Sequence, residues 1–167
     1  MRGTVHGAMI GVRALEPDEA GWAEALYTRY WGAPLSARKG ELVDLRTLPA
    51  LVAELDGERS GLATYAIRGD ACELASMIAL VEGAGVARAL VGAVKGAAAR
   101  AGCASVWLIT TNDNTRALRA YQRHGFDLVA LHHGAVDDSR RRLKPEIPPT
   151  GRDGIPLRHE LELALRL

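Results

Sequence analysis

A tyrosine near the middle of the chain is spaced to take part in proton transfer. In the segment 114–126, Asn114 can cap a helix that carries Ala117 and Tyr121 one turn apart, and Gly125 ends it before Phe126. A phenol of pKa about 10 can donate a proton to a leaving thiolate, the anion of a thiol of pKa about 8.5. Each residue also has a purely structural interpretation: Asn114 as a helix N-cap, and Tyr121 as an aromatic ring in the core.

A glycine loop precedes an alanine-rich helical segment earlier in the chain. Gly83 and Gly85 allow close backbone approach, and the free amide groups of the helix start that follows suit a diphosphate. The alternative interpretation is structural: the two glycines are there only because the loop needs positive φ angles. A dinucleotide-binding fingerprint would need a third glycine where Arg88 stands, and the Gly-Lys-Ser/Thr of a P-loop is missing.

The order of these features points to acyl transfer. A phosphate-binding helix start, an apolar strand-like run over 106–110 and a helix that presents a tyrosine suit a coenzyme A thioester as donor. The spacing Asn-x-x-Ala-x-x-x-Tyr-x-x-x-Gly-Phe behind a glycine loop resembles the GNAT superfamily of N-acetyltransferases. The resemblance covers about residues 45–133. Within the loop, Gly85 and Ala87 match the family pattern, whereas Glu82 replaces the usual Arg or Gln, and Arg88 is the residue expected to offset its charge.

The resemblance implies acetyl-CoA as the cosubstrate, with no metal. Backbone amides of the loop would hold its diphosphate, and the residues concerned are Gly83, Ala84, Gly85, Val86, Ala87 and Arg88. The end of the preceding strand would hydrogen-bond the pantetheine arm as an added strand does, through Ile78, Ala79 and Leu80. Asn114 would contact the arm, and Tyr121 would point at the thioester sulfur as general acid.

Direct attack by an amine also requires a base, because a lysine-like ammonium has a pKa of about 10.4. Glu73 lies where enzymes of the family often place one, although an exposed strand carboxylate or a water chain is an alternative. Trp31 and Arg38 flank the segment that shapes the acceptor pocket in the family. His159 interrupts an apolar face, so it is either a hydrogen-bonded core histidine or a residue that reaches the acceptor.

The pattern of apolar residues predicts an α/β fold. It has a GNAT-type mixed central sheet, mostly antiparallel with one parallel β-α-β crossover, flanked by helices. Strands are expected over 8–15, 50–55, 61–68, 72–80, 105–110, 127–133 and 157–167, and helices over 17–31, 85–101, 114–124 and 135–143. In the strand 157–167, leucines alternate with mostly charged residues, so we expect the leucines to face the core. Residues 35–49 read as irregular or weakly helical.

Composition fits one soluble globular domain over residues 1–167. The net charge of +1 gives no sign of nucleic-acid binding, and no apolar run is long enough for a membrane span or a signal peptide at the start. Cys72 and Cys103 are expected to be buried and reduced, as in a cytoplasmic protein.

These observations predict an acetyl-CoA-dependent N-acetyltransferase that modifies a primary amine. The acceptor is a small-molecule amine or a protein amine, no membrane or nucleic-acid partner is expected, and the protein would be a monomer or a homodimer. The alternative is a non-catalytic acyl-CoA-binding or regulatory domain with the same fold. Tyr121 favours the enzyme, and Glu82 keeps the alternative open.

Overall fold

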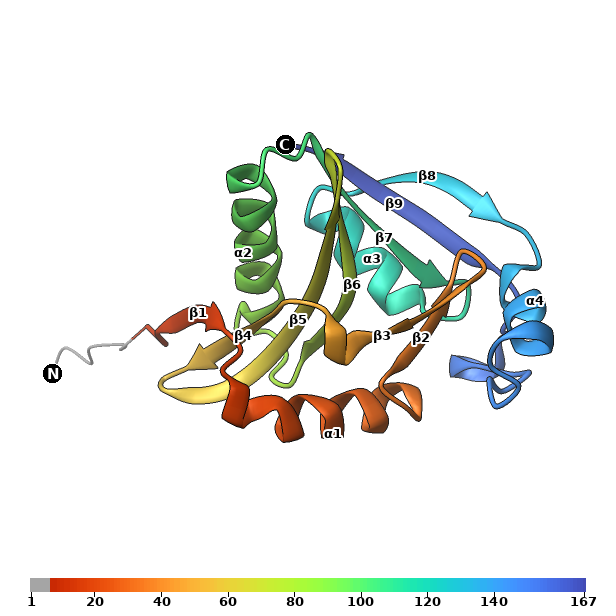
Figure 1. The fold of residues 1–167 in the computed structure, drawn as a ribbon, viewed down its shortest axis with the longest axis horizontal. Helices are drawn as coiled ribbons and strands as arrows, with labels where there is room; N and C mark the ends of the chain where they lie inside the picture. Colours follow the sequence, from red (N-terminus) through yellow and green to blue (C-terminus); the bar gives the residue numbers. More distant parts are fainter. Residues whose placement is uncertain (1–6) are drawn as a thin grey trace, which may run out of the picture.

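The computed structural model describes residues 7–167. Residues 1–6 lie outside the described residues, and with them part of the expected domain and of the start in which no signal peptide is predicted. Its centre is a seven-stranded mixed sheet of order β1-β4-β5-β6-β7-β9-β8, and a separate two-stranded hairpin, β2–β3, lies in front of it (Figure 1). The expected α/β fold with one parallel pair is confirmed.

The first strand and helix follow the predicted pattern. β1 (Ile10–Ala14) pairs antiparallel with β4, a 3-10 turn follows over Pro17–Glu19, and α1 spans Ala20–Trp31. Gly32, at φ +78°, ends α1 in the left-handed region that glycine adopts without strain.

The segment after α1 differs from the prediction. Instead of irregular or weakly helical structure, β2 (Leu35–Arg38) and β3 (Glu41–Asp44) form an antiparallel hairpin, followed by a short 3-10 turn at Leu45–Thr47. Lys39 and Gly40 make the two-residue turn, and both have positive φ, as in a type I′ turn.

Three antiparallel strands form the centre of the sheet, as predicted. β4 (Ala50–Leu55), β5 (Glu58–Arg68) and β6 (Ala71–Ala79) are joined by tight turns, and the register shifts once in each pair. α2 (Val86–Arg100) then crosses over the sheet to β7 (Ser105–Thr111).

The parallel contact between β6 and β7 is short. Only three residue pairs join them, Ala71–Ser105, Cys72–Val106 and Glu73–Trp107. Within residues 7–167 no strand pairs with the β7-facing edge of β6 beyond Glu73, so the two strands diverge toward the end of β6.

The last elements are α3 (Thr115–Arg123), β8 (Asp127–His132), α4 (Ala135–Arg142) and β9 (Glu160–Arg166). β9 enters the sheet between β7 and β8 and pairs antiparallel with both. The predicted C-terminal strand is therefore confirmed over 160–166.

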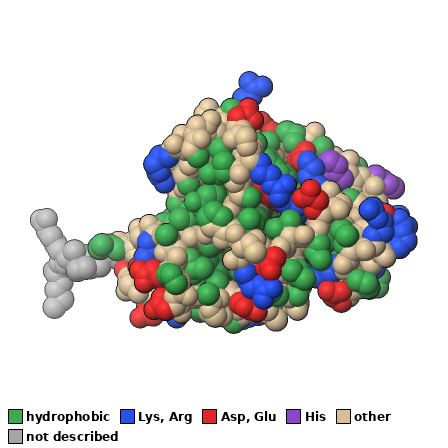
Figure 2. Space-filling model, viewed as in Figure 1, with side chains coloured by type: hydrophobic (Ala, Val, Ile, Leu, Met, Phe, Trp, Pro, Cys, Tyr) green, Lys and Arg blue, Asp and Glu red, His purple; other side chains and the backbone are tan. Residues whose placement is uncertain are grey.

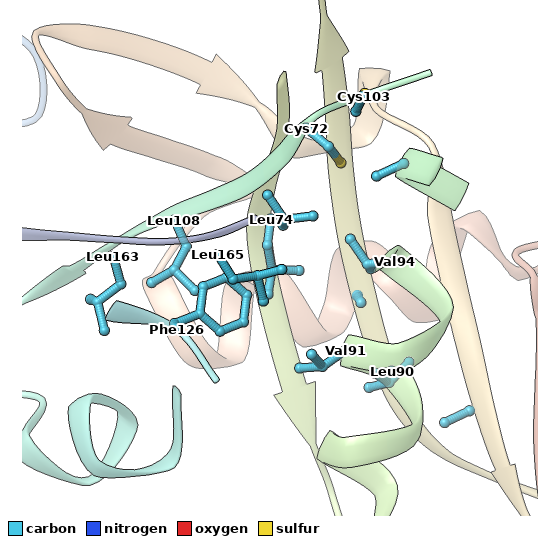
Figure 3. Close-up of a cluster of buried hydrophobic side chains, with 14 of the residues drawn as sticks. Cys72, Leu74, Leu90, Val91, Val94, Cys103, Leu108, Phe126, Leu163 and Leu165 are labelled. Atoms are coloured by element: carbon cyan, nitrogen blue, oxygen red, sulfur yellow. The ribbon is translucent and has the colours of Figure 1, made fainter. Parts of the chain in front are cut away.

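Two apolar cores cover opposite faces of the sheet. α2 and α3 lie over the larger core, where Leu163 and Leu165 of β9 pack near Phe126 and Leu108 (Figure 3). α1 covers the smaller one. The leucines of β9 face the core as expected, except that Leu167 beyond the strand is 44% exposed.

Both cysteines are free and buried, as predicted, and Cys72 and Cys103 lie at one end of the larger core (Figure 3). On the face drawn in Figure 2, acidic and basic side chains are interspersed rather than gathered into a patch of one sign.

Candidate active site

A cavity of about 840 Å³ opens where β6 and β7 diverge. Its walls come from the end of α1, β2, β6, β7 and the start of α3, and from α4 with the loop that follows it. The volume is in the range of sites for small ligands, which usually measure about 300–1,000 Å³. Chain segments far apart in the sequence therefore meet around one pocket.

Tyr121 reaches this cavity from α3 together with Asn114 and Ala117. Asn114 caps the helix, since its side-chain oxygen accepts from the amide of Ala117 at 3.2 Å. The Tyr121 ring packs edge-on against Phe126, with ring centroids 5.7 Å apart. Burial raises the pKa of the Tyr121 phenol to about 12, so at neutral pH the hydroxyl is protonated and able to donate.

The glycine loop has the geometry that an anion site needs. Gly83 and Gly85 have φ of +71° and +84°, and Gly85 is the N-cap of α2. The Ala89 amide makes the first bond of the helix, to the Gly85 carbonyl at 3.0 Å. The amides of residues 86–88 precede that bond and have no helical partner, so they are free to bind an anion.

Glu82 is paired in this loop, although with a different residue from the one expected. Its carboxylate forms an ion pair with Arg116 of α3, not with Arg88. Both side chains are largely exposed, at 70% and 73%. The negative charge next to the loop is therefore partly offset from the neighbouring helix.

The end of β6 provides the open edge that an extended ligand arm could join. Ile78 and Ala79 pair with β5 on one side, and the amide of Leu80 bonds to the Ser60 carbonyl at 2.9 Å. On the other side, β6 has no strand partner beyond Glu73 within residues 7–167. The Ile78 side chain itself is buried in the smaller core.

Glu73 is buried at the cavity instead of lying exposed on the strand. It is 2% exposed, and Arg38 is 5% exposed. Arg38 donates to both Glu73 oxygens, from Nε at 2.7 Å and from Nη2 at 2.6 Å, and also to Glu41 at 3.1 Å. Arg38 is therefore a partner of Glu73 and Glu41, and the β2–β3 hairpin holds it in place. Trp31 lines the mouth of the cavity and is 37% exposed.

His159 does not line the cavity with the other residues expected at the acceptor. Its Nδ1 accepts from the amide of Gly134 at 2.8 Å, and its ring lies 4.4 Å from that of His133. Of the two interpretations, the hydrogen-bonded, partly buried histidine fits its position. The loop 144–149 that precedes it does line the cavity.

Sequence reasoning did not single out Ser76, Ser139 and Glu160, three of the buried polar residues that line this cavity. Glu160 carried a weak signal, because it begins the alternating strand, but alternation alone placed it on the solvent side. The two serines had no local pattern.

The chain belongs to the acetyltransferase (GNAT) family. The model of that family, described as "Acetyltransferase (GNAT) family", matches residues 14–126. An uncharacterized protein of Bacillus subtilis, YdhI, is 37% identical over 136 residues, which is 81% of this chain and 84% of YdhI.

Solved structures agree on the fold. An IAA acetyltransferase from Bacillus cereus superposes with a TM-score of 0.69 at 16% identity, over 95% of this chain and 100% of that one. A GNAT family acetyltransferase from Elizabethkingia anophelis with acetyl-CoA bound also gives 0.69 at 16% identity, over 95% and 98% of the two chains. By its family, the protein is an acetyltransferase.

Two further findings concern metals and membranes. Among residues 7–167, no group of three or more His, Cys, Asp or Glu side chains is placed to hold a metal ion. No helix in this described part is long and apolar enough to cross a bilayer.

Proposed function

We propose that the protein transfers the acetyl group of acetyl-CoA to a primary amine. The observation that carries this proposal is the position of Tyr121, a partly buried and protonated phenol in the cavity that opens between β6 and β7. Acetyl-CoA supplies a thioester carbonyl that an amine can attack directly. The acetyl-CoA bound by the Elizabethkingia neighbour supports the choice of donor.

The residues present fit this coenzyme. The free amides at the start of α2 and the glycines Gly83 and Gly85 suit a diphosphate, and the open edge of β6 suits an extended arm. A Cβ at Gly83 would meet no heavy atom within 4 Å, so the loop is open to an approaching ligand. In this proposal the loop 83–88 binds the diphosphate, Ile78–Leu80 bind the arm, and Asn114 contacts it.

Tyr121 is the general acid in this proposal. Its raised pKa means that the phenol keeps its proton across the physiological range. Because a thiol is more acidic than this phenol, Tyr121 must take a proton from the attacking nitrogen as it gives its own to the sulfur. The ring contact with Phe126 fixes the position of the tyrosine.

The attacking amine also needs a base, and Glu73 is the carboxylate that the sequence suggests for this role. Glu73 lies at the cavity, but both of its oxygens already accept from Arg38. Neither oxygen is therefore free to accept a proton from a substrate unless the contact with Arg38 opens. Glu73 is thus less suited to act as the base than a carboxylate at the cavity with a free oxygen would be.

The test is calorimetry with acetyl-CoA, followed by a thiol-release assay with small primary amines. Binding with a 1:1 stoichiometry and amine-dependent release of free thiol are expected. Absence of binding would contradict the proposal. Binding without release to any amine would instead favour a non-catalytic acyl-CoA-binding domain.

A further inference from the structure

Three residues that line the cavity each have a buried polar side-chain atom without a hydrogen-bond partner. The atoms are Oε1 of Glu160, Oγ of Ser76 and Oγ of Ser139, on β9, β6 and α4. Their residues are 1%, 6% and 2% exposed. Among residues 7–167 only four buried side-chain N or O atoms lack a partner, and three of the four belong to residues that line this one pocket. An unpaired buried polar atom destabilises the fold, and a ligand that binds to it removes this penalty.

Glu160 differs from Glu73 in how its oxygens are used. Its Oε2 accepts from the backbone amide of Lys39 at 3.0 Å, while its Oε1 accepts nothing. The Lys39 ammonium group bonds to Glu162 instead, at 2.8 Å. Glu160 is therefore a buried carboxylate in the cavity to which no cationic side chain donates a hydrogen bond in the described part of the chain. A cation is the natural ligand for such a group.

A buried lysine ties two walls of the cavity together. Lys144, 7% exposed, donates from Nζ to the carbonyls of Trp31 at 3.0 Å and Leu35 at 2.9 Å. It thereby fastens the loop after α4 to the junction of α1 and β2. Arg140 stiffens the same loop through bonds to the carbonyls of Ile147, Pro148 and Leu157. The bridge joins two walls of the cavity through a buried side chain, an arrangement that favours a compact acceptor over a polypeptide.

On the basis of the proposed function, we propose that Glu160, Ser76 and Ser139 bind the primary ammonium group of a small-molecule acceptor, and that Glu160 is the base. An ammonium group has three N–H donors and no acceptor, which matches one carboxylate oxygen and two hydroxyl oxygens. The acceptor is thus a compact amine that lies wholly within the pocket.

The reaction balances as follows. Glu160 takes one proton from the ammonium group, and the freed nitrogen lone pair forms a C–N bond to the acetyl carbon as the C–S bond breaks. Tyr121 gives its proton to the departing sulfur. The second proton lost by the nitrogen replaces the one on Tyr121, and the proton on Glu160 leaves to solvent. The products are an N-acetylated amine, the coenzyme thiol and one proton.

The environment of Glu160 suits this role. Burial raises the pKa of its carboxyl above the ordinary value, toward the pH at which a general base works well. The amide of Lys39 and the charges of His132, Arg38 and Lys39 oppose the increase. Because the folded protein holds this carboxyl at a higher pKa than the unfolded chain, ionised Glu160 lowers stability above that folded pKa, and the loss disappears as the pH falls toward the unfolded pKa.

The experiment compares Glu160→Gln with Glu162→Gln, which changes the next carboxylate on the same side of β9. The assay uses acetyl-CoA with a panel of small primary amines that includes phenethylamine and putrescine, and with an octapeptide that has a free N-terminus. For the amines that the wild type acetylates, Glu160→Gln should lower kcat/KM by about 10²–10⁴-fold. Glu162→Gln should stay within about threefold, and the coenzyme Kd should be unchanged in both.

Melting temperatures give a readout that does not depend on turnover. Glu160→Gln should melt at the same temperature as wild type or higher at pH 8, and the difference should shrink as the pH falls toward 4, because the wild-type carboxyl then becomes neutral. A carboxylate with only a structural role would give a lower melting temperature at pH 8. As a second variant, Ser139→Ala should raise the amine KM by about 2–10-fold with little change in kcat.

The outcomes separate the two proposals. Wild-type turnover that Glu160→Gln leaves intact would overturn the role of Glu160 and leave the proposed function standing. Faster acetylation of the octapeptide than of every small amine would overturn the small-molecule acceptor. If Glu160→Gln fails to fold, an unchanged KM in Ser139→Ala overturns the ammonium site. A wild type that acetylates no amine overturns the proposed function together with this inference.

Discussion

Arg38 donates to both carboxylate oxygens of Glu73, at 2.7 and 2.6 Å, and both residues are almost completely buried. This pair joins the β2–β3 hairpin to the central sheet at the wall of the cavity. The hairpin makes few other polar contacts with the sheet, among them the bonds of Lys39 to Glu160 and Glu162. The pair thus connects the stability of the fold to the shape of the cavity.

Removing one member of this pair should be costly. We expect Glu73→Gln to lower the free energy of unfolding by about 3 kcal/mol, the lower end of the range for a broken buried ion pair, because Glu41 still contacts Arg38. The double variant Arg38→Met, Glu73→Leu should lose less than the sum of its single variants. Urea unfolding measures all of them, and additive losses would show that the pair is not coupled.

Tyr121→Phe keeps the ring contact with Phe126 and removes only the proton. We expect kcat to fall by about 10²–10⁴-fold while the coenzyme Kd stays the same. In the wild type, the pKa of about 12 predicts that rates will show no loss from tyrosine ionisation below about pH 11. Tyr65→Phe, on β5, is the matched control, and wild-type turnover in Tyr121→Phe would assign the proton to another group.

Glu82→Gln should tighten coenzyme binding. The carboxylate lies in the glycine loop, and although it pairs with Arg116, the pair is exposed and screened by solvent. We expect the Kd for CoA to fall by about two- to fivefold at low salt and the gain to shrink at high salt. Glu24→Gln, on α1, is the control for net charge. An equal effect in both variants would place the diphosphate elsewhere.

Two glycines, Gly61 facing α2 and Gly92 within α2, give a matched test of the packing. A Cβ at Gly61 would lie 2.6 Å from Cγ1 of Val86 and 2.9 Å from the Ile78 carbonyl, so Gly61→Ala should cost about 1–3 kcal/mol. A Cβ at Gly92, within α2, meets nothing within 4 Å, and Gly92→Ala should stabilise by about 0.5–1 kcal/mol. Thermal unfolding measures both, and the same sign for the two variants would be inconsistent with this packing.

The strands and helices around the glycine loop were predictable because their patterns are local. Leu161, Leu163 and Leu165 alternate with polar residues, and this alternation predicted the strand that the structure places between β7 and β8. Asn114 and Gly125 marked the limits of α3 to within one or two residues. Each of these signals depends on residues close in the sequence.

The side of the cavity formed by the β2–β3 hairpin and β9 was not predictable in the same way. The β2–β3 hairpin turns at Lys39-Gly40, a weaker signal than Asn-Gly, and it is held by contacts to Glu73 and Glu160 that lie far away in the chain. The alternating pattern placed Glu160 on the solvent side because it could not show that the hairpin covers that side. Ser76, Ser139 and Lys144 matter only through their shared cavity.

The position of β9 between β7 and β8 has a consequence for the order of folding. β7 and β8 are successive strands of the chain, yet β8 has no neighbour in the sheet until α4, its loop and β9 have arrived. Its docking closes a long loop and should be late. Until then Leu128, Val129 and Leu131, still exposed in the final fold, form an unprotected apolar edge. Misassembly of partly folded chains should therefore begin at β8.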